Sequence, residues 1–443
     1  MLTLPIIGHK ELHSVFAYSG DRKITVEDFL REVAQLARQL PDKRHILNLC
    51  SDRYRFAVGF AAALLRGQVS LLPPNYTPSF VHRLEQSYPE LYCLADDEVS
   101  FSSLEIVRFP RTVSADKSPV TIPTVPTSQC AALVFTSGST GLPVAHPKSW
   151  GSLCSGAKAE ALALGITHDS GLAVLGTVPA QHMYGLESCM LLALQCGLAL
   201  VAERSFYPAD ICARLQSLPT PRCLVTTPVH LRTLLAEAVE LPAVDFVLCA
   251  TALLPPQLAQ DSEKRFGAPL YEIYGCTEAG MVASRRTIQG QAWDLLRDVE
   301  MRQDEQGTYV CGGHVEIEAL LSDVIVRNTD DTFVLHGRTA DLVNIAGKRT
   351  SLSSLNHLLN EIPGVRDGVF FMPDDADGAM KRPLAFVVAP GLSSEDILNT
   401  LRHSVDAVFL PRPLYFVEAL PRNTTGKLAR ESLMQLMQRC AQK

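Results

Sequence analysis

The sequence predicts an α/β protein with two domains: a large N-terminal domain of mainly parallel sheets with helices plus a small antiparallel barrel-like part, and a small mobile α+β domain. Between residues 131 and 274, short apolar strands alternate with helical segments, which is typical of a parallel sheet covered on both faces. After about residue 297, short strands are separated by Gly, Asp and Asn turns, as in an antiparallel sheet or barrel. A compact α+β pattern follows from residue 341. We therefore expect domains at residues 1–337 and 338–443.

Composition limits the classes of function. The 443 residues carry a net charge of −7, with 47% hydrophobic and 20% charged residues, so a folded globular protein is expected. The negative charge opposes sequence-independent binding to nucleic acid. The twelve cysteines contain no C-x-x-C pair, which argues against a disulfide framework or a zinc site. The N-terminal segment turns polar after seven residues, so we expect no signal peptide, no membrane span and a cytoplasmic location.

The first 130 residues contain the elements of an α/β unit. Residues 25–40 place apolar side chains at helical spacing behind a capping residue, and residues 56–65 are apolar and helical in length. Residues 69–72 form an apolar run closed by two prolines, which predicts a strand. Four prolines between residues 108 and 129 indicate an extended surface connection.

The later elements are predicted by the same patterns. Apolar runs predict the parallel strands at 131–135, 171–178, 198–202, 223–227 and 246–250. Four antiparallel strands are expected at 308–313, 315–320, 323–328 and 332–337. In the small domain we expect helices at 353–362, 394–405 and after 428, with strands at 365–372 and 384–389.

The most informative segment is FTSGSTGLPVAHPK, residues 135–148, which begins at the end of a predicted strand. Successive hydroxyl and glycine residues bring side-chain and backbone donors into one small volume, as a polyphosphate requires. The segment is not a Walker A loop, because Pro143 stands five residues after Gly138 where that motif needs a glycine. Taken alone, a solvated Gly/Ser turn remains the alternative.

Residues 136–143 resemble the phosphate loop of the AMP-forming adenylating enzymes, the superfamily of acyl-CoA synthetases, nonribosomal peptide adenylation domains and luciferases. The resemblance implies that the loop binds the phosphates of ATP through Thr136, Ser137, Gly138, Ser139, Thr140 and Gly141. Val144 occupies the usual lysine position, and Lys148 is our candidate to supply the missing charge.

Two further motifs occur in the family's order. PAQHMYGL, residues 179–186, resembles the motif that borders the carboxylate pocket and makes His182 the candidate there, although such a histidine is more often structural. YEIYGCTEAG, residues 271–280, resembles the motif that implies adenine stacking by Tyr274, phosphate contact by Thr277 and Mg²⁺ binding by Glu278. A hard cation bridging phosphates favours a carboxylate oxygen. Gly275 in this motif is placed beside the substrate.

The resemblance continues towards the C-terminus. CATALL places Thr251 near the nucleotide and Ala252 near the substrate, and LSDV places Asp323 on the ribose hydroxyls. GRTADLVNIAGKR resembles the domain junction, with Arg338 as the ribose and phosphate contact and Ala340 at the hinge position. The same motif implies a loop for the second half-reaction, made of Gly347, Lys348 and Arg349. PRNTTGK resembles the loop that carries the catalytic lysine, Lys427.

Together the motifs imply a two-step ligase that uses ATP and Mg²⁺. A carboxylic acid first becomes an acyl adenylate with release of pyrophosphate, and a phosphopantetheine thiol then accepts the acyl group. The sequences FTSGSTGLPVAHPKSW and QHMYGLE resemble those of a narrower group, the ligases of aryl polyene and xanthomonadin-type clusters. This favours an aromatic acid, such as a hydroxybenzoate, and an acyl carrier protein as acceptor.

Three alternatives stay open from the sequence. Free coenzyme A can replace the carrier protein, since both end in the same phosphopantetheine thiol. A non-catalytic nucleotide-binding homologue is suggested by Val144 and Ala340, but the other motif residues are present together. Kinase-type phosphoryl transfer would yield ADP, and no matching loop for it occurs.

Overall fold

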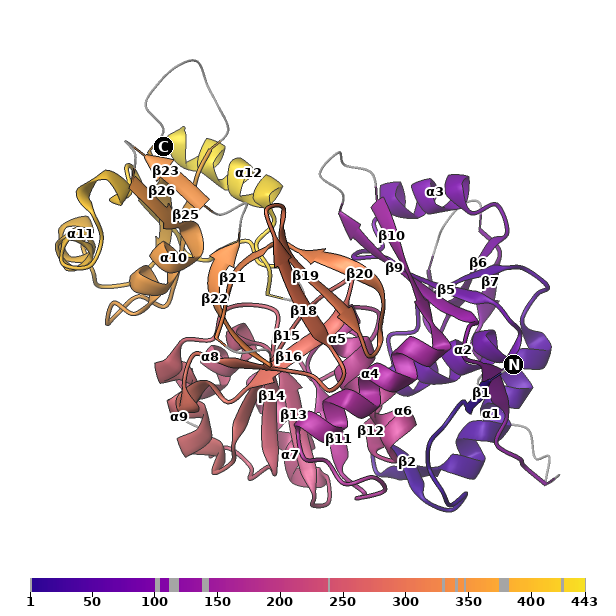
Figure 1. Ribbon diagram of the computed structural model, residues 1–443. Helices are drawn as coiled ribbons and strands as arrows, with labels where there is room; N and C mark the ends of the chain where they lie inside the picture. The colour runs from indigo at the N-terminus through magenta and orange to yellow at the C-terminus, as the bar shows by residue number, and fades with distance from the viewer. Residues whose placement is uncertain are drawn as a thin grey trace.

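The computed structural model describes residues 2–99, 104–110, 119–137, 143–237, 240–328, 331–338, 342–345, 348–373, 382–423 and 426–442. Figure 1 shows a large part, running from indigo to orange, and a smaller orange and yellow part that carries the C-terminus. The α/β class predicted from the sequence is confirmed, with parallel strands and helices alternating in the large part.

The first sheet of the large part has six strands in the order β10-β9-β5-β4-β6-β7. All neighbours are parallel except β10, which pairs antiparallel with β9 directly after the phosphate-loop segment. The strands are β4 (His45–Asn48), β5 (Val69–Leu72), β6 (Leu91–Ala95), β7 (Ile106–Arg108), β9 (Cys130–Ser137) and β10 (Pro143–Ser149).

The second sheet has eleven strands in the order β21-β22-β17-β16-β15-β14-β13-β11-β12-β2-β3. Its parallel centre runs from β15 to β2, and antiparallel strands extend both ends. The central strands are β2 (Val15–Ser19), β11 (Ala173–Gly176), β12 (Ala199–Val201), β13 (Arg222–Thr226), β14 (Phe246–Cys249) and β15 (Leu270–Cys276). The flanking strands are β3 (Arg22–Thr25), β16 (Gly280–Arg285), β17 (Trp293–Leu295), β21 (Asp323–Arg327) and β22 (Thr332–Arg338).

Alternating strand residues bury both faces of the parallel centre, as the continuous apolar runs predict. Val174 and Leu248 pack in the main core between the two sheets, with α1 (Val26–Gln39), α2 (Arg53–Leu65) and α4 (Trp150–Ala163). Their neighbours in sequence pack on the opposite face against three helices, α7 (Pro208–Ser217), α8 (Pro228–Ala236) and α9 (Pro256–Phe266).

Other helices of the large part include two that the sequence patterns did not predict. One is α3 (Pro78–Ser87), which covers the outer face of the first sheet. The other is a π-helix, Leu186–Leu191, which lies between the short helices α5 (Met183–Gly185) and α6 (Leu192–Cys196). The N-terminus of α1 carries the expected cap. The Thr25 side chain accepts a hydrogen bond from Asp28 N–H, and the Asp28 side chain accepts one from Thr25 N–H.

The four antiparallel strands expected after residue 307 divide between two sheets. The first two, β19 (Gly307–Gly312) and β20 (Val315–Leu321), join β18 (Glu300–Asp304) in a three-stranded sheet. The last two, β21 and β22, extend the eleven-stranded sheet through β17. A short pattern specifies a strand but not its partner, which is why the sequence grouped all four.

In its described residues, the small part contains two short sheets, three α-helices and a 3-10 helix, Ala407–Phe409. Its strands are β23 (Leu342–Ile345), β24 (Lys348–Ser351), β25 (Asp367–Phe371), β26 (Leu384–Val388) and β27 (Leu414–Phe416). Its helices are α10 (Leu352–Asn360), α11 (Ser394–Arg402) and α12 (Arg430–Ala441). Its hydrophobic clusters span residues 343–440 and are separate from those of residues 4–335. This separation supports our proposed boundary between residues 337 and 338.

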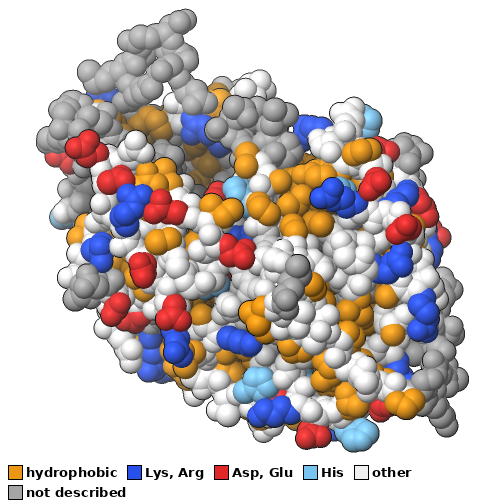
Figure 2. All heavy atoms as spheres, turned by 45° about the vertical axis from the view of Figure 1, so that its right-hand side comes forward, with side chains coloured by type: hydrophobic (Ala, Val, Ile, Leu, Met, Phe, Trp, Pro, Cys, Tyr) orange, Lys and Arg blue, Asp and Glu red, His pale blue; other side chains and the backbone are white. Residues whose placement is uncertain are grey.

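The surface and the cysteines match a reduced globular chain. On the face shown in Figure 2, acidic and basic side chains are interspersed with hydrophobic ones over the described residues. All twelve cysteines are free thiols, and eight of the nine between residues 50 and 249 are buried. Within the described ranges, no helix is both long and apolar enough to cross a membrane.

Candidate active site

A pocket of about 310 Å³ lies where the carboxyl ends of several strands meet the small part. Thr136 near the end of β9, Thr251 just after β14 and Gly275 near the end of β15 all line it. The carboxyl ends of parallel strands share one edge of a sheet, which is where α/β proteins bind ligands. Lys427 reaches the same pocket from the small part, so the chain brings together residues that are far apart in the sequence.

The loop before α12 fixes the backbone of Lys427. Its N–H donates to Asn423 Oδ1 at 2.8 Å, and its carbonyl accepts from Asn423 N–H at 2.8 Å. Arg422 donates to the carbonyl of Gly426 at 2.7 Å, and Gly426 has φ +78°, a conformation that favours glycine. The exposed Lys427 side chain therefore extends from a loop at the pocket wall whose backbone is fixed by hydrogen bonds.

His182 lies in the same pocket, directly before α5. Burial lowers its pKa to about 4, and the positive charges of Lys427 and Arg204 act in the same direction. The imidazole is therefore neutral near pH 7 and is able to donate one hydrogen bond. A neutral donor beside two cations is an environment that suits a bound carboxylate.

Tyr274 and Asp323 form a second group at the end of the large sheet. Tyr274 Oη donates to Asp323 Oδ2 at 2.7 Å, and the Tyr274 ring contacts Trp293 and Phe333 with centroid distances of 5.7 Å. Asp323 pairs in register with Arg338 of β22, so the backbone places these two residues opposite each other. The aromatic and carboxylate groups expected to bind adenine and ribose thus lie side by side.

Two backbone features shape the pocket. A Cβ on Gly275 would collide with the carbonyl oxygen of Gly280, so the turn between β15 and β16 requires glycine there. Thr251 has φ +83°, a rare conformation for a β-branched residue. Strain of this kind costs on the order of 1–3 kcal/mol and clusters at functional sites.

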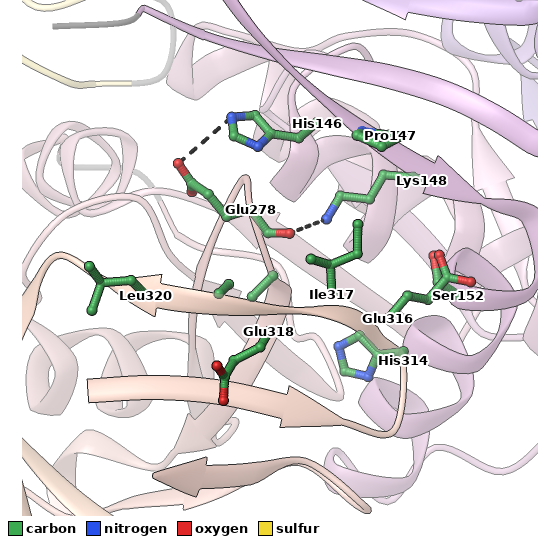
Figure 3. A pocket seen from close by; sticks show the side chains of 12 residues that line it. His146, Pro147, Lys148, Ser152, Glu278, His314, Glu316, Ile317, Glu318 and Leu320 are labelled. Atoms are coloured by element: carbon green, nitrogen blue, oxygen red, sulfur yellow. Dashed lines mark hydrogen bonds and ion pairs between the residues drawn. The ribbon is translucent and has the colours of Figure 1, made fainter. Parts of the chain in front are cut away.

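Glu278 lines a neighbouring cavity of about 300 Å³ (Figure 3). The buried Lys148 ammonium donates a hydrogen bond to the backbone carbonyl of Glu278 at 2.7 Å. His146 Nε2 lies 3.8 Å from Glu278 Oε1 and shares a 3.0 Å hydrogen bond with Thr136 Oγ1. Burial lowers the pKa of Lys148, and the carboxylates of Glu187 and Glu278 oppose that shift.

The residues at the site fit a magnesium–nucleotide complex. Glu278 offers an exposed carboxylate beside Thr277, which lines the pocket. The described residues contain no cluster of three or more His, Cys, Asp or Glu side chains able to hold a metal by themselves. Mg²⁺ is commonly held by one or two carboxylates together with substrate phosphates, which is the arrangement that a single glutamate beside a phosphate loop permits.

Several expected site residues lie outside this geometry. Ala252 follows Thr251 but is not part of the pocket lining, and Lys148 belongs to the neighbouring cavity. Only the backbone is described for Ser137, Arg338, Lys348 and Arg349. Gly138, Ser139, Thr140, Gly141, Ala340 and Gly347 lie outside the described residues. The roles of all these residues stay predictions.

The structure also places residues at the site that sequence reasoning missed. Asn423 and Gln181 line the pocket, and so does Glu187, whose pKa burial raises to about 7 against the nearby charge of Lys148. His146 lies between Thr136 and Glu278. The signal for His146 was present, because residues two apart in a strand share a face and His146 stands between Val144 and Lys148.

Comparisons with known proteins place this geometry in a family. The family model described as AMP-binding enzyme matches residues 9–319, and the model of the AMP-binding enzyme C-terminal domain matches residues 355–427. A 4-coumarate–CoA ligase of Rhodobacter capsulatus is 29% identical over 305 residues, covering 68% of this chain and 75% of that protein. A 3-hydroxybenzoate–CoA/4-hydroxybenzoate–CoA ligase of Thauera aromatica is 22% identical over 356 residues, covering 69% and 66%.

Solved structures agree on the fold. The O-succinylbenzoate coenzyme A synthetase of Bacillus subtilis in complex with ATP and magnesium ion superposes with a TM-score of 0.81 at 18% identity, covering 95% of this chain and 97% of that one. Since one family model alone spans more than half of the sequence, the chain belongs to the AMP-binding enzyme family.

Proposed function

We propose that the protein activates a carboxylic acid with ATP and transfers the acyl group to a phosphopantetheine thiol. The observation that carries this proposal is the meeting of Lys427 with His182 and Thr136 in one pocket. A lysine presented by a second part of the chain beside a phosphate loop is suited to bind both a carboxylate and the α-phosphate. The proposed roles of the individual residues follow from this arrangement.

In the first step, one carboxylate oxygen attacks the α-phosphorus of ATP, and the bond from that phosphorus to the β-phosphate bridging oxygen breaks. The electron pair leaves with pyrophosphate, and the acyl adenylate remains. Lys427, which lines the pocket, would contact both reacting anions and reduce their repulsion, a positioning and electrostatic role that needs no proton transfer. Mg²⁺ held by Glu278 would add positive charge at the phosphates.

In the second step, the thiol sulfur attacks the acyl carbon and the bond from that carbon to the AMP oxygen breaks. AMP leaves with the electron pair, and the thiol proton passes to solvent. We propose that the small part rotates near residue 340 between the steps, which withdraws Lys427 and brings residues 347–349 to the site. This rotation rests on the family resemblance.

For the substrate, we propose an aromatic acid. Apolar and aromatic side chains line the pocket beyond His182, among them Val178, Tyr184, Ile273 and Met281, and they favour a ring over a charged chain. The relatives that act on coumarate and hydroxybenzoates support the same substrate class.

The thiol is coenzyme A in our leading proposal, because the relatives above carry coenzyme A in their names. The carrier protein is the second candidate, because the sequences of residues 135–150 and 181–187 resemble the aryl polyene and xanthomonadin-type ligases. The two acceptors make different demands, since a carrier protein needs a docking surface and free coenzyme A needs a nucleotide site.

An acceptor assay tests the proposal. Purified protein with ATP, Mg²⁺ and hydroxybenzoates or cinnamates is given coenzyme A, a phosphopantetheinylated carrier protein, or neither, and AMP, ADP and thioester are quantified. We expect AMP and a thioester with one of the two thiols. ADP formation would indicate phosphoryl transfer, and nucleotide binding without AMP formation would indicate a non-catalytic homologue.

A further inference from the structure

We propose that His146 is a positioning residue that joins the phosphate loop to the metal-binding glutamate, taking over part of the task of the loop lysine that this chain lacks. This inference rests on the proposed function, since it assigns a role to a residue beside that site. It predicts that His146 acts on the metal-bound nucleotide through Thr136 and Glu278 and does not contact the carboxylic acid.

The geometry of β10 carries the inference. Val144, His146 and Lys148 alternate along this strand and share a face, and the register places His146 opposite Val134 of β9. His146 Nε2 hydrogen-bonds Thr136 Oγ1 at 3.0 Å and lies 3.8 Å from Glu278 Oε1. One imidazole nitrogen therefore faces the first threonine of the loop and the carboxylate at the same time.

Lys148 complements this contact from the other end of Glu278. Its ammonium holds the backbone carbonyl of Glu278 at 2.7 Å, while His146 faces the carboxylate, as Figure 3 shows. Lys148 thus holds the backbone of Glu278, and His146 of the same strand lies against its carboxylate. Both come from β10, which pairs with β9 beside Thr136, so Thr136 and Glu278 are linked through one strand.

The missing lysine at position 144 explains why contacts made by His146 would be useful. At position 144, the lysine position of the motif that this loop resembles, the chain has a valine whose side chain is 47% exposed and carries no charge. The His146 side chain is only 18% exposed, whereas the Glu278 side chain that it faces is 41% exposed and open to a metal ion. Groups that orient a metal ligand through hydrogen bonds typically change metal affinity by about 10- to 100-fold when removed.

The test compares nucleotide binding with and without metal. Isothermal titration calorimetry measures the Kd of α,β-methylene ATP in Mn²⁺ and in EDTA for wild type, His146→Ala, His146→Gln and the control His82→Ala. His82 is an exposed histidine of α3 that contacts Gln86 and Glu85, away from the site. The His146→Gln variant keeps a side-chain nitrogen donor at nearly the reach of Nε2.

We expect His146→Ala to weaken binding of the analogue about tenfold in the presence of metal and less than about twofold in its absence, because the effect of the substitution acts through Glu278. His146→Gln should recover most of the affinity, and His82→Ala should match wild type. Equal losses with and without metal, no loss, or no recovery by glutamine would overturn the inference. If His146→Ala does not fold, the affinity of His146→Gln for the analogue is compared with that of wild type. A loss of more than about twofold that occurs only with metal would then show that glutamine does not replace the histidine donor.

Failure of the wider proposal gives a different result. If wild type releases pyrophosphate in the presence of acid but His146→Ala binds the metal–nucleotide normally, only the role of His146 is wrong. If wild type itself shows no metal-dependent binding of the analogue, the proposed function falls and the role of His146 falls with it.

Discussion

Lys427 and His182 show how single residues are tuned at this site. The lysine backbone is held on both sides by Asn423, while its side chain is exposed towards the pocket. The pKa of His182 is lowered to about 4, first by burial and then by the charge of Lys427. Together they provide a cation and a neutral donor, which is a suitable pair for a carboxylate that must remain a nucleophile.

Replacing Lys427 by alanine tests its proposed role in the first half-reaction. We expect acid-dependent pyrophosphate release to fall by about 100-fold or more, since one group that stabilises developing charge is lost. Transfer from a supplied acyl adenylate should change little, and the exposed Lys264→Ala variant should behave as wild type in both assays. Equal loss in both half-reactions of a folded variant would contradict the role of Lys427.

The Tyr274–Asp323 hydrogen bond gives a second prediction at this scale. Tyr274→Phe keeps the ring but removes the 2.7 Å contact to Asp323, so the carboxylate is held less firmly. We expect the KM for ATP to rise by about fivefold with kcat nearly unchanged, the cost of one ordinary hydrogen bond. Steady-state kinetics beside the control Tyr309→Phe, on β19, checks this; a fall in kcat alone would argue against a binding role.

At the scale of elements, α4 and the π-helix carry two buried carboxyl groups, one of which, that of Glu187, lines the pocket. Glu160 of α4 is fully buried, and burial raises its pKa to about 8, with the Ser188 hydroxyl and the charge of Glu187 as smaller influences. The pKa of Glu187 is raised to about 7 for the same main reason. The folded protein therefore keeps protons at these positions that the unfolded chain releases.

The sign of the pH dependence follows from that difference. Between the ordinary value of 4.5 and about 8, the folded state holds the Glu160 proton and the unfolded state does not, so the free energy of unfolding falls as pH rises. Below that window the contribution is fully present, and above it the curve is flat. We expect Glu160→Gln to lower the slope of the curve, with the contribution of Glu187 remaining, and to be at least as stable as wild type above a pH of about 8.

Urea unfolding across this pH range measures the effect. The matched control is Glu305→Gln, which changes an exposed glutamate between β18 and β19 and should run parallel to wild type. A Glu160→Gln curve parallel to wild type would show that this carboxyl does not titrate in the window.

The elements also show how far the sequence leads. Apolar runs and caps identified α1, α2, α10 and the central parallel strands, because these depend on local pattern. The pairing of β9 with β5 and the approach of Glu278 to His146 depend on partners that are distant in the sequence, so local pattern does not reveal them. The same reason explains why β19 and β20 were not separated from β21 and β22.

The candidate site was predictable to the extent that its motifs are short and contiguous. Thr136, His182, Thr277 and Lys427 were expected from motifs, and the structure brings all four to one pocket. The walls formed by Glu187 and Asn423 were not expected, because these side chains gain their place only through the fold.

At the scale of the whole molecule, an ion pair joins the two parts in the observed arrangement. Arg232 of α8 lies 3.5 Å from Asp367 of β25, and Asp367 is also held by two 2.8 Å hydrogen bonds from Arg422. Arg422 in turn supports the loop of Lys427 through Gly426. The contact therefore favours the arrangement in which Lys427 lines the pocket.

Loss of this contact should affect the steps unequally. We expect Arg232→Ala to slow acyl adenylate formation by up to about fivefold, the value of a partly exposed ion pair, and to leave transfer from a supplied adenylate unchanged or faster. Arg232→Lys should restore most of the first rate. Rapid-quench measurement of both half-reactions checks this, and a slower second step alone would contradict it.

Acid-dependent pyrophosphate release by the wild-type protein, measured with ATP, Mg²⁺ and a panel of hydroxybenzoates, cinnamates and medium-chain fatty acids, tests the central claim most directly. We expect stoichiometric AMP and pyrophosphate, with an aromatic acid as the preferred substrate. No release with any acid, from folded protein that binds ATP, would contradict it.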